Sequence, residues 1–285
     1  MSDDAQWVAD PEPQLRVTDG FRLETTPTDT HPGFTGGKVE GRRALADTAD
    51  RLADLQERLF AASRAAGDER RVLLVLQGMD TAGKGGIIKH VVGSVDPQGV
   101  QLAAFKAPTE EELAHDFLWR IRREVPGPGM IGVFDRSHYE DVLIGRVRRL
   151  ASPEELERRY GAIVEFESEL TAAGVTIVKV MLHVSRDEQK ARLMKRLERP
   201  DKHWKFNSGD IDEREQWPKY QEAYQAVLER TSTEAAPWYV VPADHKWYPR
   251  LAVASLLIGA LESMRLEWPV ADFDVAAELA RLTAS

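Results

Sequence analysis

Short apolar runs alternate with amphipathic segments along most of the chain. Five runs have the near-continuous apolar character of strands buried on both faces of a parallel sheet, namely residues 72–76, 100–105, 130–134, 175–184 and 238–241. In the segments around these runs apolar residues recur at helical spacing. This spacing predicts helices over residues 41–66, 86–92, 110–124, 138–149, 153–172, 186–197, 210–230 and 246–266. This alternation predicts an α/β fold, in which right-handed crossovers build a central parallel sheet that helices cover on both faces.

The N-terminal residues lack this pattern. Residues 1–40 are rich in Pro, Gly, Thr and Asp and show no period, so we expect an extension that is irregular or packs over the domain surface. Residues 41–270 are then expected to form one domain with a lid at about 190–215, and residues 271–285 a C-terminal tail. A chain of 285 residues, of which 42% are apolar, has enough material for a sizeable core.

Composition and charge exclude several classes of protein. The chain has no cysteine, which excludes disulfides, thiolate metal sites and cysteine nucleophiles. No uncharged apolar run approaches transmembrane length, and the acidic start lacks the order of a signal peptide, so we expect a cytoplasmic protein without a membrane partner. The net charge of -9 disfavours nucleic acid as a partner. The charge is unevenly distributed, however, because Lys and Arg are concentrated in residues 136–149 and 186–205.

A glycine-rich segment follows the first predicted strand. Its sequence GMDTAGKG, at residues 78–85, matches the pattern G-x-x-x-x-G-K, in which backbone N–H groups turn toward phosphate oxygens and the lysine reaches the outer phosphates. The segment precedes a predicted helix, whose positive N-terminal end favours an anion. We therefore predict a phosphate-binding loop with Lys84 as its charged residue. The simpler alternative is a glycine-rich turn in which Lys84 is merely solvated.

One departure from the usual loop concerns a metal ion. Gly85 stands where a Ser or Thr usually holds magnesium, and Asp80 lies inside the loop. A carboxylate beside a polyphosphate chain is repelled unless a cation lies between them, so we expect Asp80 to help bind Mg²⁺. The alternative is that Asp80 caps the following helix or points to solvent.

The third predicted strand ends in a second acidic residue, Asp135. In phosphate-loop enzymes an acid at the end of a neighbouring strand holds the metal. The next residue, Arg136, carries a planar fork that donates two hydrogen bonds to one phosphate. The alternative is a local ion pair between these two side chains. His138 and Glu140 follow, but magnesium prefers oxygen ligands, and no second histidine lies at helical ligand spacing.

A basic helix precedes an irregular segment that combines cations with aromatic residues. The helix at 186–199 carries a cluster of Lys and Arg, and the sequence KHWKFN follows at residues 202–207. Such a combination suits a lid that closes over a charged substrate and excludes water from phosphoryl transfer. The alternatives are a solvated basic face and a loop whose Trp204 packs on the core.

Six motifs together resemble the family-2 polyphosphate kinases. They occur in the expected order between about residues 40 and 266, and they read GMDTAGKGG, FKAPTEEE, HDFLWR, FDRSHYEDVL, KHWKFN and PWYVVPADHKWY. The resemblance implies a three-layer, P-loop kinase-like fold with a helical lid, which transfers phosphoryl groups between linear polyphosphate and nucleoside mono- or diphosphates with a divalent metal. FDRSHYEDVL resembles the one-domain subgroup that accepts both AMP and ADP, whose members often carry Asn where this chain has Asp135.

The motifs, the basic helix and the resemblance together predict the roles of individual residues. The expected catalytic residues are Asp80, Lys84, Asp135 and Arg136, with Asp80 and Asp135 as ligands of Mg²⁺, or of Mn²⁺ in its place. Nucleotide or phosphate binding is expected from Gly78, Met79, Thr81, Ala82, Gly83, Gly85, Gly86, Lys106, Glu140 and Arg146. Polyphosphate contacts in the lid are expected from Arg192, Arg196, Lys202 and Lys205.

The expected partners are inorganic polyphosphate and AMP, ADP and ATP, and we expect a dimer or tetramer of identical copies. Two other functions fit the same loop and lid. One is an ATP-dependent kinase of a nucleoside or small metabolite, which would not use polyphosphate as a donor. The other is a nucleotide-binding switch or a polyphosphate-binding module, which would show no turnover.

Overall fold

A parallel sheet of five strands forms the centre of the molecule. The computed structural model describes residues 7–285, and its strands are β1 (Arg71–Gly78), β2 (Val100–Ala104), β3 (Ile131–Asp135), β4 (Val175–His183) and β5 (Trp238–Pro242). Their order in the sheet is β2-β3-β1-β4-β5. Each strand lies within two residues of its prediction, because an apolar run of this kind is stable only when both of its faces are covered.

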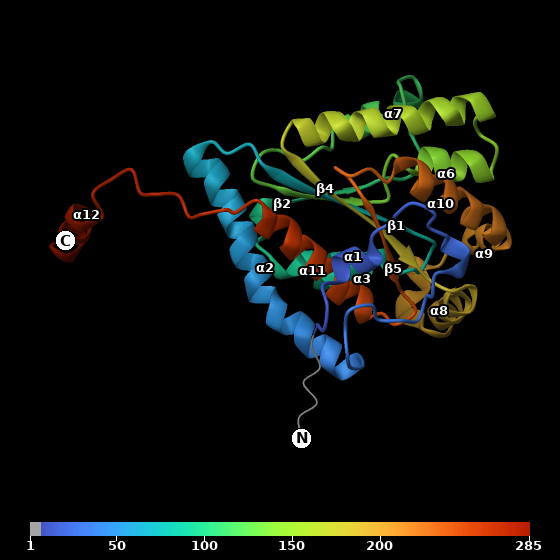
Figure 1. The fold of residues 1–285 in the computed structure, drawn as a ribbon, viewed down its shortest axis with the longest axis horizontal. Coiled ribbons are helices and arrows are strands. Elements are labelled where there is room, and N and C mark those ends of the chain that lie inside the picture. Colours follow the sequence, from blue (N-terminus) through green and yellow to red (C-terminus); the bar gives the residue numbers. More distant parts are fainter. Residues whose placement is uncertain (1–6) are drawn as a thin grey trace.

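Helices cover both faces of the sheet (Figure 1). One layer consists of α6 (Glu140–Val147), α7 (Pro153–Ala172) and α10 (Trp217–Thr231). The other consists of α2 (Lys38–Ala66), α3 (Lys84–His90) and α11 (Tyr248–Ser263). Helix α11 is apolar on nearly all sides because it packs between the sheet and α2. The predicted three-layer α/β fold is confirmed.

The predicted helix at 110–124 is wrong, because this stretch forms two single turns, α4 (Glu110–Leu113) and α5 (Trp119–Arg122). Between them the Asp116 carboxylate accepts a hydrogen bond of 3.0 Å from the backbone N–H of Leu118. Such a local bond competes with the helical pattern. Leu113, in the first of these turns, is 68% exposed.

The segment predicted as a lid is mostly helical rather than irregular. It consists of α8 (Arg186–Glu198), the 3-10 helix η4 (Pro200–Lys205) and α9 (Gly209–Glu215). A separate helix, α10, then begins at Trp217 with Pro218 in its first turn, where a missing N–H costs nothing. Short 3-10 turns η2 (Val92–Ser94) and η3 (Pro97–Gly99) connect α3 to β2.

The N-terminal arm, residues 7–37, packs on the domain. It contains α1 (Pro11–Leu15) and the 3-10 turn η1 (Leu23–Thr25). Arg16 forms an antiparallel bridge with Tyr239 of β5, and Leu15 and Leu23 are buried. Of the two expectations for this segment, packing over the domain surface is therefore confirmed for the described residues.

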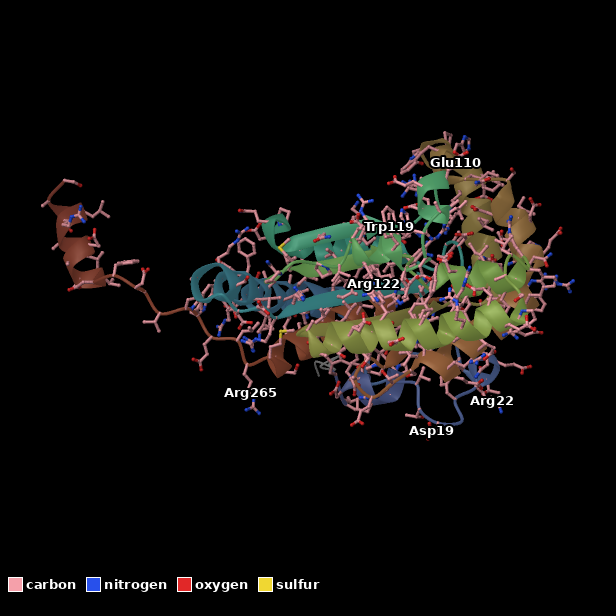
Figure 2. All side chains as sticks on the ribbon, turned by 90° about the horizontal axis from the view of Figure 1, so that it is seen from above. Asp19, Arg22, Glu110, Trp119, Arg122 and Arg265 are labelled. Atoms are coloured by element: carbon pink, nitrogen blue, oxygen red, sulfur yellow. The ribbon has the colours of Figure 1, made fainter. Side chains whose placement is uncertain are left out.

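The C-terminal tail contains a helix, α12 (Val275–Thr283), none of whose residues is buried. It stands away from the domain at the end of an extended segment (Figure 1), and Figure 2 shows this segment leaving the domain near Arg265. Among the described residues, no helix is both long enough and apolar enough to cross a membrane.

Candidate active site

The first two predicted site motifs lie side by side at the carboxyl edge of the sheet. Strands β1 and β3 are parallel neighbours, with Leu76 paired to Asp135, so the loop after Gly78 begins next to Asp135. Gly78 has φ +147°, and a Cβ there would lie 2.8 Å from the carbonyl oxygen of Leu182. Only glycine fits this close approach of β1 to β4.

The side chain of Lys84 spans the phosphate loop. Lys84 donates a hydrogen bond of 2.7 Å to the carbonyl of Gly78, which places its ammonium across the loop. Thr81 and Gly83 both have positive φ, at +66° and +128°. Alternating backbone conformations of this kind turn successive N–H groups toward one point, which forms an anion-binding concavity.

Asp80 and Arg136 form the contact at the centre of the site. The guanidinium Nη2 of Arg136 lies 3.1 Å from the carboxylate of Asp80. The expected alternative, an isolated pair of Asp135 with Arg136, therefore does not describe the site. Burial opposes the charge on Arg136, but Glu140, Asp80 and Asp135 outweigh it and raise its pKa. Asp80 does not cap α3, since the residue at that position is Gly83.

A cleft with a volume of about 670 Å³ lies over the phosphate loop. Twelve lysines and arginines line it among the described residues, against two carboxylates, Asp80 and Asp135. The field in such a cleft attracts an anion with many charges, because walls of one sign concentrate the potential.

Most of the predicted phosphate contacts lie on this cleft. They are Asp80, Thr81, Ala82, Gly83, Lys84, Gly85, Gly86, Lys106, Asp135, Arg136, Arg192, Arg196, Lys202 and Lys205. The prediction missed six basic residues that also line it, namely Lys89, His90, Lys195, Arg199, Lys246 and Arg250. Lys246 and Arg250 follow β5, and the rule that ligands bind at the carboxyl ends of parallel strands could have found them.

A second pocket of about 220 Å³ opens on the other side of the Asp80–Arg136 pair. Gly78, Met79 and Glu140 lie on its wall. Its remaining wall was not predicted and combines acidic, aromatic and apolar groups, namely Leu143, Ile144, Arg148, Asn207, Gly209, Asp210, Glu213, Tyr220 and Tyr224. The two pockets share Asp80 and Arg136, so ligands in both would meet at this ion pair.

Glu140 is held in the second pocket by an amide. In the orientation that satisfies both neighbours, Gln77 donates a 3.0 Å hydrogen bond to Glu140 and accepts one of 3.1 Å from Ser137. Burial raises the pKa of Glu140, although Arg136 and Lys84 oppose this shift.

The geometry corrects the prediction for two arginines. Arg192 is only 5% exposed, and its guanidinium donates to backbone carbonyls, including those of Thr81 and Ala82 at 2.9 Å each. Because its N–H groups donate to carbonyls inside the protein, Arg192 stabilises the phosphate loop and does not contact polyphosphate. Arg146 lines neither pocket and instead faces Tyr160 and Glu157 of α7. Helical spacing turns it away from the side that carries Glu140.

The lid cations lie on the cleft with different partners. Arg196 forms an ion pair of 3.4 Å with Asp210 of the second pocket. Lys202 pairs with Asp201 at 3.0 Å, and the ammonium of Lys205 lies 4.7 Å from the ring centre of Trp204. Trp204 is 77% exposed, so the alternative in which it packs on the core is wrong.

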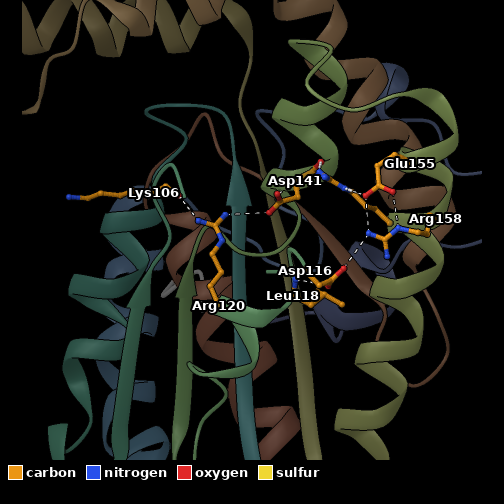
Figure 3. A network of polar contacts seen from close by, with 8 residues as sticks. Lys106, Asp116, Leu118, Arg120, Asp141, Glu155 and Arg158 are labelled. Atoms are coloured by element: carbon orange, nitrogen blue, oxygen red, sulfur yellow. Dashed lines mark hydrogen bonds and ion pairs between the residues drawn. The ribbon is translucent and has the colours of Figure 1, made fainter. Parts of the chain in front are cut away.

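A buried arginine positions the segment that carries Lys106. Arg120 is 7% exposed and donates to the carbonyl of Lys106 at 2.9 Å and to the carboxylate of Asp141 at 3.3 Å (Figure 3). It thereby ties the strand end after β2 to α6. The side chain of Lys106 is left facing the cleft.

The loop after Arg136 rests on a buried polar network. His138 lies 3.2 Å from Glu167, so it is engaged inside the protein and is not placed to bind a metal with Glu140. Tyr139 donates to the same carboxylate at 2.7 Å, and Lys179 forms an ion pair with it at 2.5 Å. Replacing one partner would leave a buried charge unpaired, so this network fixes the loop.

Comparisons with known proteins agree with this geometry. The family model described as polyphosphate kinase 2 matches residues 37–269. An AMP/ADP-polyphosphate phosphotransferase of Meiothermus ruber is 46% identical over 87% of this chain and 91% of its own length. An ADP-polyphosphate phosphotransferase of Rhodopseudomonas palustris is 42% identical over 90% of this chain and 91% of its own length.

Solved structures agree as well. The crystal structure of polyphosphate kinase 2 from Arthrobacter aurescens TC1 is 58% identical, with a TM-score of 0.96 over 98% of this chain and 99% of that chain. Because the family model covers well over half of the sequence and these relatives match along most of both chains, the chain belongs to the polyphosphate kinase 2 family.

Proposed function

We propose that this protein transfers phosphoryl groups between inorganic polyphosphate and nucleotides, with AMP and ADP as acceptors. The observation that carries this proposal is the cleft over the phosphate loop, where twelve cations face two carboxylates. A nucleotide tail of two or three phosphates needs only part of such a surface. A linear polyphosphate, with a charge on each phosphate, can contact many of these cations at once.

The second pocket is the proposed nucleotide site. Its tyrosines and apolar side chains offer surfaces for a base, while Glu140, Asp210 and Glu213 offer acceptors for amino and hydroxyl groups. Polyphosphate in the large cleft and a nucleotide in the small pocket would bring their terminal phosphates together at Asp80 and Arg136. This is the arrangement that in-line transfer requires.

Phosphoryl transfer asks mainly for alignment and charge compensation. Lys84 and Arg136 would neutralise the oxygens of the transferred group, and the N–H groups of residues 81–86 would hold the donor chain. The acceptor is a phosphate oxygen that is already ionised at neutral pH, so no strong general base is needed. Phosphoanhydride bonds are broken and formed on the two sides, so the reaction should be reversible, and excess polyphosphate should drive ATP formation.

Magnesium fits the residues present. No group of three or more His, Asp or Glu side chains in residues 7–285 could hold a metal by itself. Mg²⁺ commonly binds through one or two carboxylates together with substrate phosphates and water. Asp80 and Asp135 supply such a pair of oxygen ligands on the cleft wall. When bound, the ion would offset the negative charge between donor and acceptor, and Mn²⁺ would serve by the same ligands.

The segment at about 190–215 is the proposed lid. Its cations enter the cleft from α8 and η4, and Arg196 and Asp210 connect the walls of the two pockets. Closing this segment over both substrates would exclude water and suppress hydrolysis of the transferred group.

Self-association is a further part of the proposal. Helix α12 and the short segment before it expose apolar side chains, with Phe273 at 59%, Leu279 at 59% and Leu282 at 73% exposure. Contact between such side chains and water is unfavourable, and we expect copies of this chain to cover them in a dimer or tetramer. Light scattering should give a multiple of 32.0 kDa, and Leu279→Asp with Leu282→Asp should reduce that mass. An unchanged mass would show that α12 does not take part.

Nucleotide chromatography tests the proposed activity. Purified protein with AMP, Mg²⁺ and polyphosphate, but no ATP, should form ADP and then ATP. Product only when ATP is the phosphoryl donor would instead indicate a conventional metabolite kinase. Binding of polyphosphate without any product would indicate a binding module.

A further inference from the structure

The N-terminal arm ends where the match to the family model begins, at residue 37, yet it contacts a loop of the cleft. We call residues 243–248, which follow β5, the cleft loop. This loop carries Lys246 to the wall of the large cleft. The arm reaches it from a distance of more than 200 residues in sequence, so the contact is purely tertiary.

Two hydrogen bonds join Thr28 of the arm to Asp244 of the cleft loop. The Thr28 hydroxyl donates to the Asp244 carboxylate at 2.8 Å, and the Asp244 N–H donates to the Thr28 carbonyl at 3.0 Å. The Tyr248 hydroxyl also donates to the carbonyl of Pro32 at 2.7 Å. Because Thr28 both donates to and accepts from Asp244, these hydrogen bonds hold the cleft loop against the arm.

The path continues from the cleft loop to the phosphate loop through Arg192. Its Nη2 donates to the carbonyls of Ala243 at 2.6 Å and of Asp244 at 2.9 Å. Its Nη1 donates to the carbonyls of Thr81 and Ala82. Because Arg192 is buried, water cannot easily replace these partners, and movement of the cleft loop would be transmitted to the phosphate loop.

Asp244 also holds the helix that carries the lid cations. Its second carboxylate oxygen accepts a 2.7 Å hydrogen bond from the backbone N–H of Ser185, the N-cap residue of α8. One side chain therefore contacts the arm and the start of α8, while its own backbone lies in the cleft loop.

We infer that the N-terminal arm is a positioning element of the phosphate site, and that Thr28 acts through Asp244 to set the places of Lys246, Arg192 and the phosphate loop. This inference rests on the proposed function of the cleft. Positioning matters there because a small displacement of charged groups weakens their alignment with a bound polyanion.

The test is Thr28→Val, which keeps the shape of the side chain and removes its hydroxyl. The KM for polyphosphate should rise about three- to tenfold, the range that corresponds to the net contribution of one ordinary hydrogen bond. The KM for the nucleotide should change little, and Thr28→Ser should restore wild-type values. The matched control is Thr25→Val on the same arm, whose hydroxyl donates to the nearby carbonyl of Arg22 and not to the cleft loop.

A second readout separates this inference from the proposed function. Calorimetry with tripolyphosphate should show weaker binding to Thr28→Val than to wild type and Thr25→Val, whether or not turnover occurs. Wild type that binds tripolyphosphate without transferring phosphate would contradict the function alone. A Thr28→Val protein with a lower melting temperature but unchanged tripolyphosphate affinity and KM values would overturn the inference, because the arm would then only stabilise the fold.

Discussion

Arg136 lies at the boundary between the two pockets in a strained backbone conformation. Its φ is +65°, a region that costs a non-glycine residue of order 1–3 kcal/mol. The conformation is held by its N–H, which donates to the carbonyl of Leu76 at 3.1 Å, and by its ion pair with Asp80. Strain of this kind is typical of a residue whose side-chain direction matters for function.

Lys84 is the residue whose loss should cost most. Lys84→Ala removes the ammonium that spans the phosphate loop and should lower kcat/KM by roughly a hundredfold or more, because its charge acts on the transferred group. Lys89→Ala, on the same helix and cleft, should cost less. Circular dichroism checks that both variants fold. Lys84→Ala activity within about tenfold of wild type would contradict this role.

Asp80 and Asp135 should control the response to magnesium. Asp80→Asn and Asp135→Asn keep the shape of each side chain and remove a charge, so each should lower kcat and raise the Mg²⁺ concentration needed for half-maximal rate. Gly85 supplies no hydroxyl ligand that would compensate. Rates are measured over a magnesium titration. Titration curves that match wild type in both variants would place the ion elsewhere.

At the scale of elements, η4 brings two lysines to the cleft from an exposed turn. Replacing Lys202 and Lys205 together with Ala should raise the KM for polyphosphate and flatten its dependence on ionic strength, because salt screens each added cation. The KM for the nucleotide should move little. The matched control replaces Lys190 and Lys219, which line neither pocket. An equal rise in both KM values would show that η4 is not part of the polyphosphate surface.

The N-terminal arm should make stability depend on pH. His31 lies 2.9 Å from His245, and burial, followed by the neighbouring His245, lowers the pKa of His31, while Asp29 opposes the shift. The unfolded chain then binds the proton more tightly, so stability is lost as pH falls below about 6.5. His31→Phe keeps a ring against Trp247. When the pH is lowered from about 7.5 to 5.5, the melting temperature of this variant should fall by less than that of wild type. Parallel curves would contradict this.

The sequence predicts those elements whose structure depends on neighbouring residues in the chain. All five strands follow from apolar runs, and the loop at residues 78–85 follows from its glycines and lysine. Asp135 follows from its place at the end of a run. The single helix predicted at 110–124 is wrong because a local hydrogen bond at Asp116, which periodicity does not register, interrupts it.

Over the whole molecule, the residues that the sequence does not predict are those with distant partners. Arg192 resembles any cation of a basic helix, and only the fold shows that carbonyls of two loops surround it. Thr28 and Asp244 are 216 residues apart, and neither belongs to a motif that indicates the contact. Conversely, arginine is a residue type that commonly binds phosphate, but the position of Arg146 on α6 turns its side chain away from both pockets.

The arrangement of the two pockets is also a property of the whole molecule. The large cleft is built from the phosphate loop, the ends of β2, β3 and β5, and the lid, and the small pocket from α6, α9 and α10. Among residues 7–285, Asp80 and Arg136 are the two that line both pockets. This geometry favours a phosphoryl donor with many charges and a separate, smaller acceptor.

The most direct test of this account is the donor specificity of AMP phosphorylation. Initial rates are measured with purified protein, AMP and Mg²⁺, with polyphosphate or ATP as the donor, and Lys84→Ala as the control for contaminating kinases. Polyphosphate alone should support ADP formation, its kcat/KM should exceed that of ATP, and Lys84→Ala should abolish the activity. ADP formation that requires ATP and is unaffected by polyphosphate would contradict the proposed function.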